Sequence, residues 1–243
     1  MVQNYETILP YCGGLLPGLF ITFEGGEGAG KSTQIKTLAD RLTEKGREVV
    51  LTREPGGSVG AEAVRHVLLS GAAEPFGSKT EVMLFAAARL DHMQQTILPA
   101  LKRDAVVLCD RFYDSTRAYQ GGGDGVSIDY LTLMEEIAVG THHPDLTIIL
   151  DIDPKIGLQR VKSRLKDTAK ASDGAKHVDR FEKDSLTVHR KRRAAFLAIA
   201  EQEKERCVIV DANQEAENVA QVIWTIIDTH IATSNKSKRR LKK

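Results

Sequence analysis

Residues 19–32, Leu-Phe-Ile-Thr-Phe-Glu-Gly-Gly-Glu-Gly-Ala-Gly-Lys-Ser, join an apolar run to the pattern G-x-x-x-x-G-K-[ST]. The apolar run predicts a buried strand, and the residues from Lys31 onward predict a helix. The glycines between them let the backbone curl so that its N–H groups point inward around an anion. Lys31 would reach the β- and γ-phosphates of a nucleoside triphosphate, and Ser32 would hold Mg²⁺. The alternative is a plain Gly-rich turn between a strand and a helix, which would require neither the lysine nor the serine. The expected triphosphate contacts are Gly25, Gly26, Glu27, Gly28, Ala29, Gly30, Lys31 and Ser32.

Apolar runs alternate with helical patterns along the rest of the chain. The runs typical of strands covered on both faces are Leu19–Phe23, Val49–Thr52, Val106–Cys109, Leu146–Leu150 and Cys207–Val210. The helical patterns are Lys31–Lys45, Ala61–Leu69, Glu81–Arg103, Ile128–Val139, Pro154–Leu165, Glu182–Glu205 and Glu215–Ile231. This order predicts an α/β fold, with a five-stranded parallel sheet, helices on both faces, and ligands at the carboxyl ends of the strands.

Composition narrows the class of protein. The chain has 243 residues, of which 42% are hydrophobic, so it can bury an ordinary core in one domain. Its net charge of +1 gives no global field for a membrane or for specific nucleic-acid binding. No apolar run reaches transmembrane length, and the three cysteines form no paired framework, so we expect a cytoplasmic protein.

Three segments have different expected roles. Residues 1–17 are expected to be a loose leader, and residues 18–232 the folded domain. Within that domain, the polar and aperiodic run 166–180 predicts a mobile loop, and we take about 160–181 as a lid. The basic tail 233–243 predicts a solvated end, with weak contact to nucleic acid as the alternative.

Charged residues follow two predicted strands at the edge where ligands are expected. Arg53 comes after the second strand within Arg-Glu-Pro-Gly-Gly, and it could bind a phosphate or be a solvated surface residue. Asp110 ends the third strand and could hold Mg²⁺ or accept a proton, while the adjacent Arg111 could neutralise an acceptor phosphate. The two could also form only a structural ion pair. Asp151 also ends a strand, but it ranks second as a metal ligand because no arginine adjoins it.

Two helical segments carry further candidates. Phe85 and Arg89 share one helix face, where they could stack a base and read its carbonyl, or be a core residue and a solvated cation. The stretch from Arg160 through Arg164 keeps like charges one turn apart, next to the mobile loop that contains Arg180. Such a helix either awaits an anion or presents a solvated charged face.

These pieces together resemble a known family. The run Leu108–Gln120 resembles the thymidylate kinase signature along its full length. The phosphate-binding loop, Thr52–Gly57, the pair of Phe85 and Arg89, and Asp179–Glu182 match the family in the same order. The resemblance covers about residues 18–230. It implies a P-loop nucleotide kinase fold, a homodimer, Mg²⁺, and a transferase that converts ATP and dTMP to ADP and dTDP for dTTP synthesis.

The resemblance also implies residue roles in dTMP binding. Phe85 would lie against the thymine ring, Arg89 at a thymine carbonyl and Thr116 at the N3 edge. Tyr119 would crowd a 2′-hydroxyl and Glu27 would take the 3′-hydroxyl. The full expected set is Glu27, Arg53, Phe85, Arg89, Arg111, Ser115, Thr116, Tyr119 and Gln120, with Arg53 and Arg111 on the phosphate. The expected metal ligands are Ser32 and Asp110.

The remaining catalytic groups are expected in the lid. The loop before Lys31 carries Glu27 and no arginine, which resembles bacterial-type members whose transition-state arginines come from the lid. The expected catalytic set is Lys31, Asp110, Arg160, Arg164 and Arg180. Phe112 departs from the Tyr or His that the family often has there, and the lid is longer than in typical bacterial members. The alternative functions are another P-loop deoxynucleotide or nucleoside kinase, and a nucleotide-binding protein without this activity.

Overall fold

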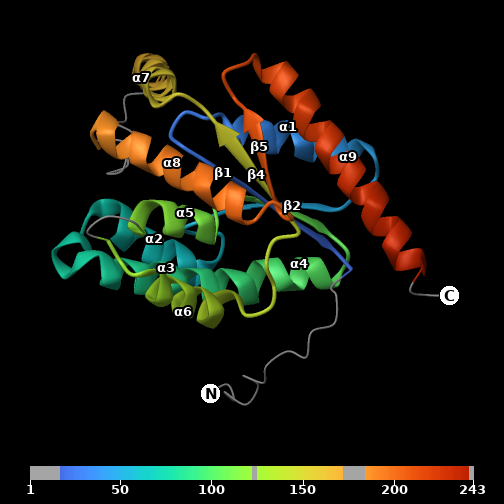
Figure 1. Cartoon of the computed structure of the whole chain (residues 1–243), viewed down its shortest axis with the longest axis horizontal. Helices are drawn as coiled ribbons and strands as arrows, with labels where there is room; N and C mark the ends of the chain where they lie inside the picture. The colour runs from blue at the N-terminus through green and yellow to red at the C-terminus, as the bar shows by residue number, and fades with distance from the viewer. Residues whose placement is uncertain (1–16, 122–124, 172–183, 241–243) are drawn as a thin grey trace.

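The computed structural model describes residues 17–121, 125–171 and 184–240. Five parallel strands form one sheet in the order β2-β3-β1-β4-β5, which confirms the predicted sheet (Figure 1). The strands are β1 (Leu19–Gly25), β2 (Val49–Arg53), β3 (Val106–Asp110), β4 (Leu146–Asp151) and β5 (Cys207–Asp211). Each strand ends one or two residues later than predicted because backbone pairing continues through polar residues, for example Arg53 with Asp110.

Helices cover both faces of this sheet (Figure 1). They are α1 (Lys31–Glu44), α2 (Val59–Ser70), α3 (Gly77–His92), α4 (Leu98–Lys102), α5 (Tyr113–Gln120), α6 (Ile128–Val139), α7 (Pro154–Ala171), α8 (Leu186–Gln202) and α9 (Ala216–Arg240). Neighbouring β1 residues face opposite layers: Ile21 packs in a core with α1 and α9, whereas Phe20 packs against α3 and α4. This alternation places the loops after the strands at one edge of a two-sided core.

Several predicted helices differ from the structure in their bounds. The predicted helix Glu81–Arg103 is divided into α3, a π-helical turn at Met93–Ile97, and α4. Pro99 lies in the first turn of α4 and has no N–H to donate, so the ladder of i→i−4 bonds cannot continue through it. The helix α7 extends past its predicted end to Ala171, into the run that predicted a mobile loop.

The helix α5 was not predicted from periodicity. Its residue Asp114 is buried and accepts hydrogen bonds from Arg206, which directly precedes β5, at 2.7 and 2.8 Å. Arg117 on the same helix pairs with Glu135 of α6 at 2.8 and 2.9 Å. These distant ion pairs hold α5 in place, together with the burial of Tyr113 and Ala118.

The chain ends are only partly described. The predicted leader lies outside the described residues except for Pro17, and so does the lid residue Arg180. The helix α9 runs to Arg240, beyond its predicted end at Ile231. Among the described residues, no helix is both long and apolar enough to cross a membrane.

Candidate active site

The phosphate-binding loop connects β1 to α1 and packs against the first turn of α7. Gly28 has a φ of 71°, and a Cβ there would lie 2.1 Å from the carbonyl oxygen of Gly157 in α7. Only glycine fits so close a backbone contact at that φ. The Lys31 ammonium group donates to the carbonyl oxygens of Gly25 at 3.1 Å and Gly26 at 3.2 Å. Burial and the neighbouring Arg111 lower the pKa of Lys31.

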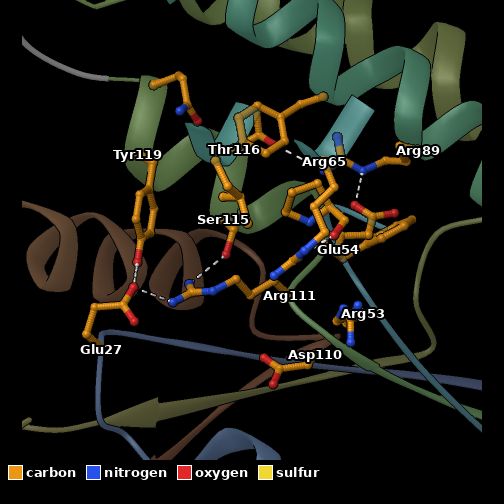
Figure 2. Close-up of a pocket in the computed structure, with 15 residues that line it drawn as sticks. Glu27, Arg53, Glu54, Arg65, Arg89, Asp110, Arg111, Ser115, Thr116 and Tyr119 are labelled. Atoms are coloured by element: carbon orange, nitrogen blue, oxygen red, sulfur yellow. Dashed lines mark hydrogen bonds and ion pairs between the residues drawn. The ribbon is translucent and has the colours of Figure 1, made fainter. Parts of the chain in front are cut away.

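Arg111 follows β3 and reaches the same loop from the other side. It has a φ of 69°, and its Nη1 donates to the Gly25 carbonyl oxygen at 3.2 Å. Lys31 and Arg111 therefore share one carbonyl acceptor, which puts the cation of the triphosphate loop beside the cation predicted for the acceptor phosphate. Arg111 Nη2 also donates to Glu27 Oε1 at 2.6 Å, and the Tyr119 hydroxyl donates to the same oxygen at 2.8 Å (Figure 2).

The carboxylate of Glu27 is strongly held in its charged form. Burial alone would raise the pKa of Glu27, but Arg111 and Lys31 outweigh it and lower that pKa to about 2. Arg111 is 18% exposed. Lys31 and Arg111 are balanced by Glu27 and by the nearby Asp110, so the two cations are held in place by neighbouring carboxylates.

Asp110 and Ser32 meet at the bottom of the site. The Ser32 hydroxyl donates to Asp110 Oδ2 at 2.8 Å. Hard oxygen donors of this kind suit Mg²⁺, which usually takes one or two protein ligands, with water and phosphate oxygens as the others. Asp151 instead accepts two hydrogen bonds from Arg193, at 2.6 and 2.7 Å. No group of three or more candidate metal ligands occurs among the described residues.

A cavity opens beside Asp110 and Arg111. It encloses about 150 Å³, and about 710 Å³ with its open mouth, which is in the size range of small-molecule sites. All nine residues expected to bind dTMP line it, namely Glu27, Arg53, Phe85, Arg89, Arg111, Ser115, Thr116, Tyr119 and Gln120. Their side chains come from separate elements but converge on one space (Figure 2).

The two ends of the cavity differ in their arginines. Arg89 is buried and donates from Nε to Glu54 at 2.8 Å and from Nη2 to the Thr116 hydroxyl at 3.0 Å. Arg53 is exposed and donates to Glu62 at 3.1 Å. The Phe85 side of the cavity is therefore fixed by buried bonds, whereas the Arg53 side is open.

Sequence reasoning missed several residues of the site. Glu54, Pro55, Arg65, Leu69 and Phe112 line the cavity, but no binding role was predicted for them. Glu54 directly follows Arg53 and is only 6% exposed. Its position in a loop did not indicate this burial. Arg65 lies one turn beyond Ala61 in α2 and donates to the Pro55 carbonyl oxygen at 2.5 Å.

Glu24 was also missed, although it lies within the quoted loop sequence. It is fully buried beneath the turn after β3 and accepts from the Phe112 N–H at 2.7 Å. It also accepts from the Ser115 N–H at 3.2 Å and from the Ser115 hydroxyl at 2.6 Å. Burial and the nearby Asp114 raise the pKa of Glu24 to about 7. Glu24 therefore holds the turn that carries Arg111.

The structure does not bring the described lid arginines to the phosphate-binding loop. Arg160 donates to the Ala212 carbonyl oxygen, after β5, at 3.1 Å. Arg164 lies on an exposed part of α7, and Arg180 lies outside the described residues. The lid assignment therefore stays a prediction.

Taken together, a phosphate-binding loop and a nucleoside-sized cavity that meet at one carbonyl oxygen define a nucleotide kinase of the P-loop class. The family model for thymidylate kinase matches residues 23–223. The chain therefore belongs to the thymidylate kinase family.

Individual relatives agree with this assignment. A thymidylate kinase from Bradyrhizobium sp. (strain ORS 278) is 51% identical over 217 residues, which are 89% of this chain and 92% of the relative. Another from Bradyrhizobium sp. (strain BTAi1) is 49% identical with the same coverage. The crystal structure of thymidylate kinase from Ehrlichia chaffeensis has a TM-score of 0.66 and 31% identity, and the match covers 86% of this chain and 98% of that one.

Membership of the family fixes the reaction. The chain is a transferase that moves the γ-phosphoryl group of ATP to dTMP, and it produces dTDP for dTTP synthesis. The predicted fold and activity are thereby confirmed.

Proposed function

We propose that phosphoryl transfer takes place across the gap between Lys31 and Arg111. The observation that carries this proposal is their shared acceptor, the carbonyl oxygen of Gly25. Lys31 and the loop N–H groups hold the ATP phosphates, while Arg111 and Arg53 hold the phosphate of dTMP. Catalysis then depends on positioning and on cations, because both substrates are anionic and charge spreads over the transferred group.

Mg²⁺ is proposed to be held by Asp110 and Ser32. Their hydrogen-bonded oxygens lie at the carboxyl end of β3 and the start of α1, next to the phosphate-binding loop. The bound ion would neutralise charge on the β- and γ-phosphate oxygens. Asp110 itself fixes Ser32, and it lies next to the arginine that orients the acceptor.

The nucleoside of dTMP is proposed to fill the rest of the cavity. Phe85 stacks on the pyrimidine, Arg89 donates to its carbonyl oxygen, and Thr116 meets the N3 edge. Gln120 supports this pose, because its buried Oε1 has no hydrogen-bond partner among the described residues and would accept from a base N–H. Glu27 takes the 3′-hydroxyl, and Tyr119 excludes a 2′-hydroxyl by its position against Glu27.

The lid is proposed to complete the site on closure. One or more of Arg160, Arg164 and Arg180 then reaches the γ-phosphoryl group, and closure excludes water that would otherwise hydrolyse ATP. The support is the contrast between a phosphate-binding loop without arginine and a basic helix α7 that packs directly on it at Gly28.

Calorimetric titration of two variants tests the proposed division of the site. Lys31→Met should weaken ATP binding and leave dTMP affinity nearly unchanged. Arg111→Lys should weaken dTMP binding about 10- to 100-fold because a bidentate guanidinium is lost, with little change for ATP. Circular dichroism checks that both variants fold. Loss of the same ligand in both variants would contradict two adjoining phosphate sites.

We also propose a homodimer formed through α2, α3 and α6. These helices lie together at one side of the molecule, with α3 between the other two (Figure 1). They and the short turn before α3 expose large apolar side chains, namely Val67, Phe76, Met83, Ile128, Leu133 and Ile137. Exposed apolar side chains on neighbouring helices suit an interface between two copies of the chain. Sedimentation should show a dimer that Met83→Glu dissociates, whereas Ile209→Glu, at an exposed site on β5, should not.

A cytoplasmic location is proposed from the cysteines. Cys109 and Cys207 are buried free thiols, and burial raises the pKa of each, so both are held as inert thiols. Such thiols suit a reducing compartment. Cell fractionation tests this: activity recovered only outside the cytoplasm would contradict it.

A further inference from the structure

A buried chain of hydrogen bonds runs behind Arg89, away from the cavity. Arg89 Nε donates to Glu54 Oε2 at 2.8 Å, and His92 Nδ1 lies 3.0 Å from Glu54 Oε1. The other ring nitrogen of His92 lies 2.6 Å from the Thr52 hydroxyl. A charged carboxylate only accepts, so His92 Nδ1 donates to Glu54, and Nε2 lies within hydrogen-bond distance of the Thr52 hydroxyl. These hydrogen bonds thus link the end of β2 to the last turn of α3.

This chain of hydrogen bonds is enclosed on every side that the structure describes. The side chains of Arg89, Glu54 and His92 are 3%, 4% and 0% exposed. A Cβ on Gly57 would lie 2.4 Å from both His92 Nε2 and Thr52 Oγ1, so the loop after β2 closes the far end. Buried charges keep their geometry only if each polar atom is paired, so the position of Glu54 fixes the plane of the Arg89 guanidinium.

Among the described residues, Nη1 is the guanidinium nitrogen of Arg89 that has no hydrogen bond to the protein, so both of its N–H groups are left for a ligand. Nε is bound to Glu54 and Nη2 to the Thr116 hydroxyl, while the Phe112 ring lies 5.2 Å from the guanidinium carbon. Among the described residues, Nη1 makes no protein hydrogen bond, and Arg89 lines the cavity next to Phe85. Figure 2 shows Arg89 with Glu54 below it and Thr116 at the same end of the cavity.

We propose that Thr52, His92 and Glu54 are positioning residues that set base selection by aiming Nη1 of Arg89 at the pyrimidine O4. This inference rests on the proposed base-reading role of Arg89. Thymine and uracil carry a carbonyl acceptor at C4, whereas cytosine carries an amino donor there. A donor that cannot turn away meets the cytosine amino group unpaired, and such a mismatch discriminates far more strongly than a missing methyl group.

The test compares kcat/KM for dTMP, dUMP and dCMP in Glu54→Gln. The amide offers one oxygen and one NH₂ to two donors, so either Arg89 or His92 loses its acceptor. We expect kcat/KM for dTMP and dUMP to fall together, about 10- to 100-fold and mainly through KM, while dCMP changes little. The preference for dTMP over dCMP therefore falls by the same factor, and the preference for dTMP over dUMP is unchanged.

The matched control is Glu62→Gln, which alters the exposed carboxylate paired with Arg53. All three nucleotides carry the same phosphate, so this change should move their kcat/KM values in equal proportion. If Glu54→Gln does not fold, His92→Gln and Thr52→Val carry the same test with smaller expected changes. An equal fall for all three nucleotides, or no change in the folded variants, would overturn the proposal.

Arg89→Lys separates this inference from the function on which it rests. If Arg89→Lys leaves the preference for dTMP over dCMP intact, Arg89 does not read the base and the assignment itself fails. If Arg89→Lys lowers that preference but Glu54→Gln, His92→Gln and Thr52→Val do not, only the positioning role fails.

Discussion

The two ends of the cavity differ in how their arginines are held. At the end proposed to bind the base, here the base end, Arg89 and Glu54 are 3% and 4% exposed and are held by hydrogen bonds to buried partners. At the end proposed to bind the phosphate, here the phosphate end, Arg53 and Glu62 are 56% and 44% exposed. The base end is therefore pre-organised, whereas the phosphate end is open at Arg53.

The difference matches the chemistry at each end. Base recognition requires a fixed direction for each hydrogen bond, and preorganisation keeps the entropic cost of binding low. In phosphoryl transfer, charge spreads over the transferred group in the transition state, so cations that the proposed lid closure would deliver would stabilise that state selectively. Arg111 is intermediate between Arg89 and Arg53 in exposure, because its side chain is 18% exposed and faces the phosphate end.

The largest expected effect is on kcat, and it concerns the lid arginines proposed to complete the phosphate end. If closure of the lid delivers an arginine, then alanine at one of Arg160, Arg164 or Arg180 should lower kcat by roughly 10³–10⁵. Single-turnover assays with saturating ATP and dTMP measure this directly. Lys162→Ala is the matched control on the same helix, and its kcat should stay within a few-fold of wild type. Wild-type kcat in all three arginine variants would show that the phosphate end is complete without the lid.

A smaller effect distinguishes the buried arginine of the phosphate end from the exposed one. Arg111→Met leaves the carboxylate of Glu27, which is only 17% exposed, without its main partner, so the free energy of unfolding should fall by about 2–4 kcal/mol. Arg53→Met breaks only an exposed pair and should cost less than about 1 kcal/mol. Urea unfolding of the ligand-free protein measures both. Equal losses would mean that Arg111 is not buried against Glu27 in solution.

A third prediction uses pH to examine the support beneath Arg111. The pKa of Glu24 is raised to about 7, so between about pH 4.5 and 7 the folded state keeps a proton that the unfolded state has lost. Unfolding then releases this proton, and the contribution of Glu24 to stability decreases as pH rises through that window, by about 1–3 kcal/mol in total.

Glu24→Gln should flatten this slope because the amide does not titrate. The comparison is made from urea midpoints at pH 5.0 and 7.5, with Glu62→Gln as the control carboxylate at the exposed end of the cavity. A wild-type slope in Glu24→Gln would assign the pH dependence to another group.

Particular residues show how far the sequence could predict this site. The positions of Lys31, Asp110 and Arg111 followed from where each apolar run ends, because strand ends of a parallel sheet meet at one edge. The helix α5 could not be predicted in that way, since its polar residues have no clear apolar period and depend on Arg206, far along the chain. Glu54 and His92 pose the same difficulty: each is polar in sequence, and only the fold brings them into one buried pair.

The smallest expected effect concerns salt at the exposed end. The Gly57 N–H and the charge of Arg53 lower the pKa of Glu62, but the pair is solvent-exposed, so salt screens it. Raising NaCl from 0.05 to 0.5 M, a range of roughly tenfold in ionic strength, should weaken dTMP binding at the phosphate. In Arg53→Met this salt dependence should be reduced, whereas in Arg89→Lys it should match wild type. Equal salt dependence in Arg53→Met and wild type would show that Arg53 does not meet the phosphate, and the contrast between the two ends would then rest on burial alone.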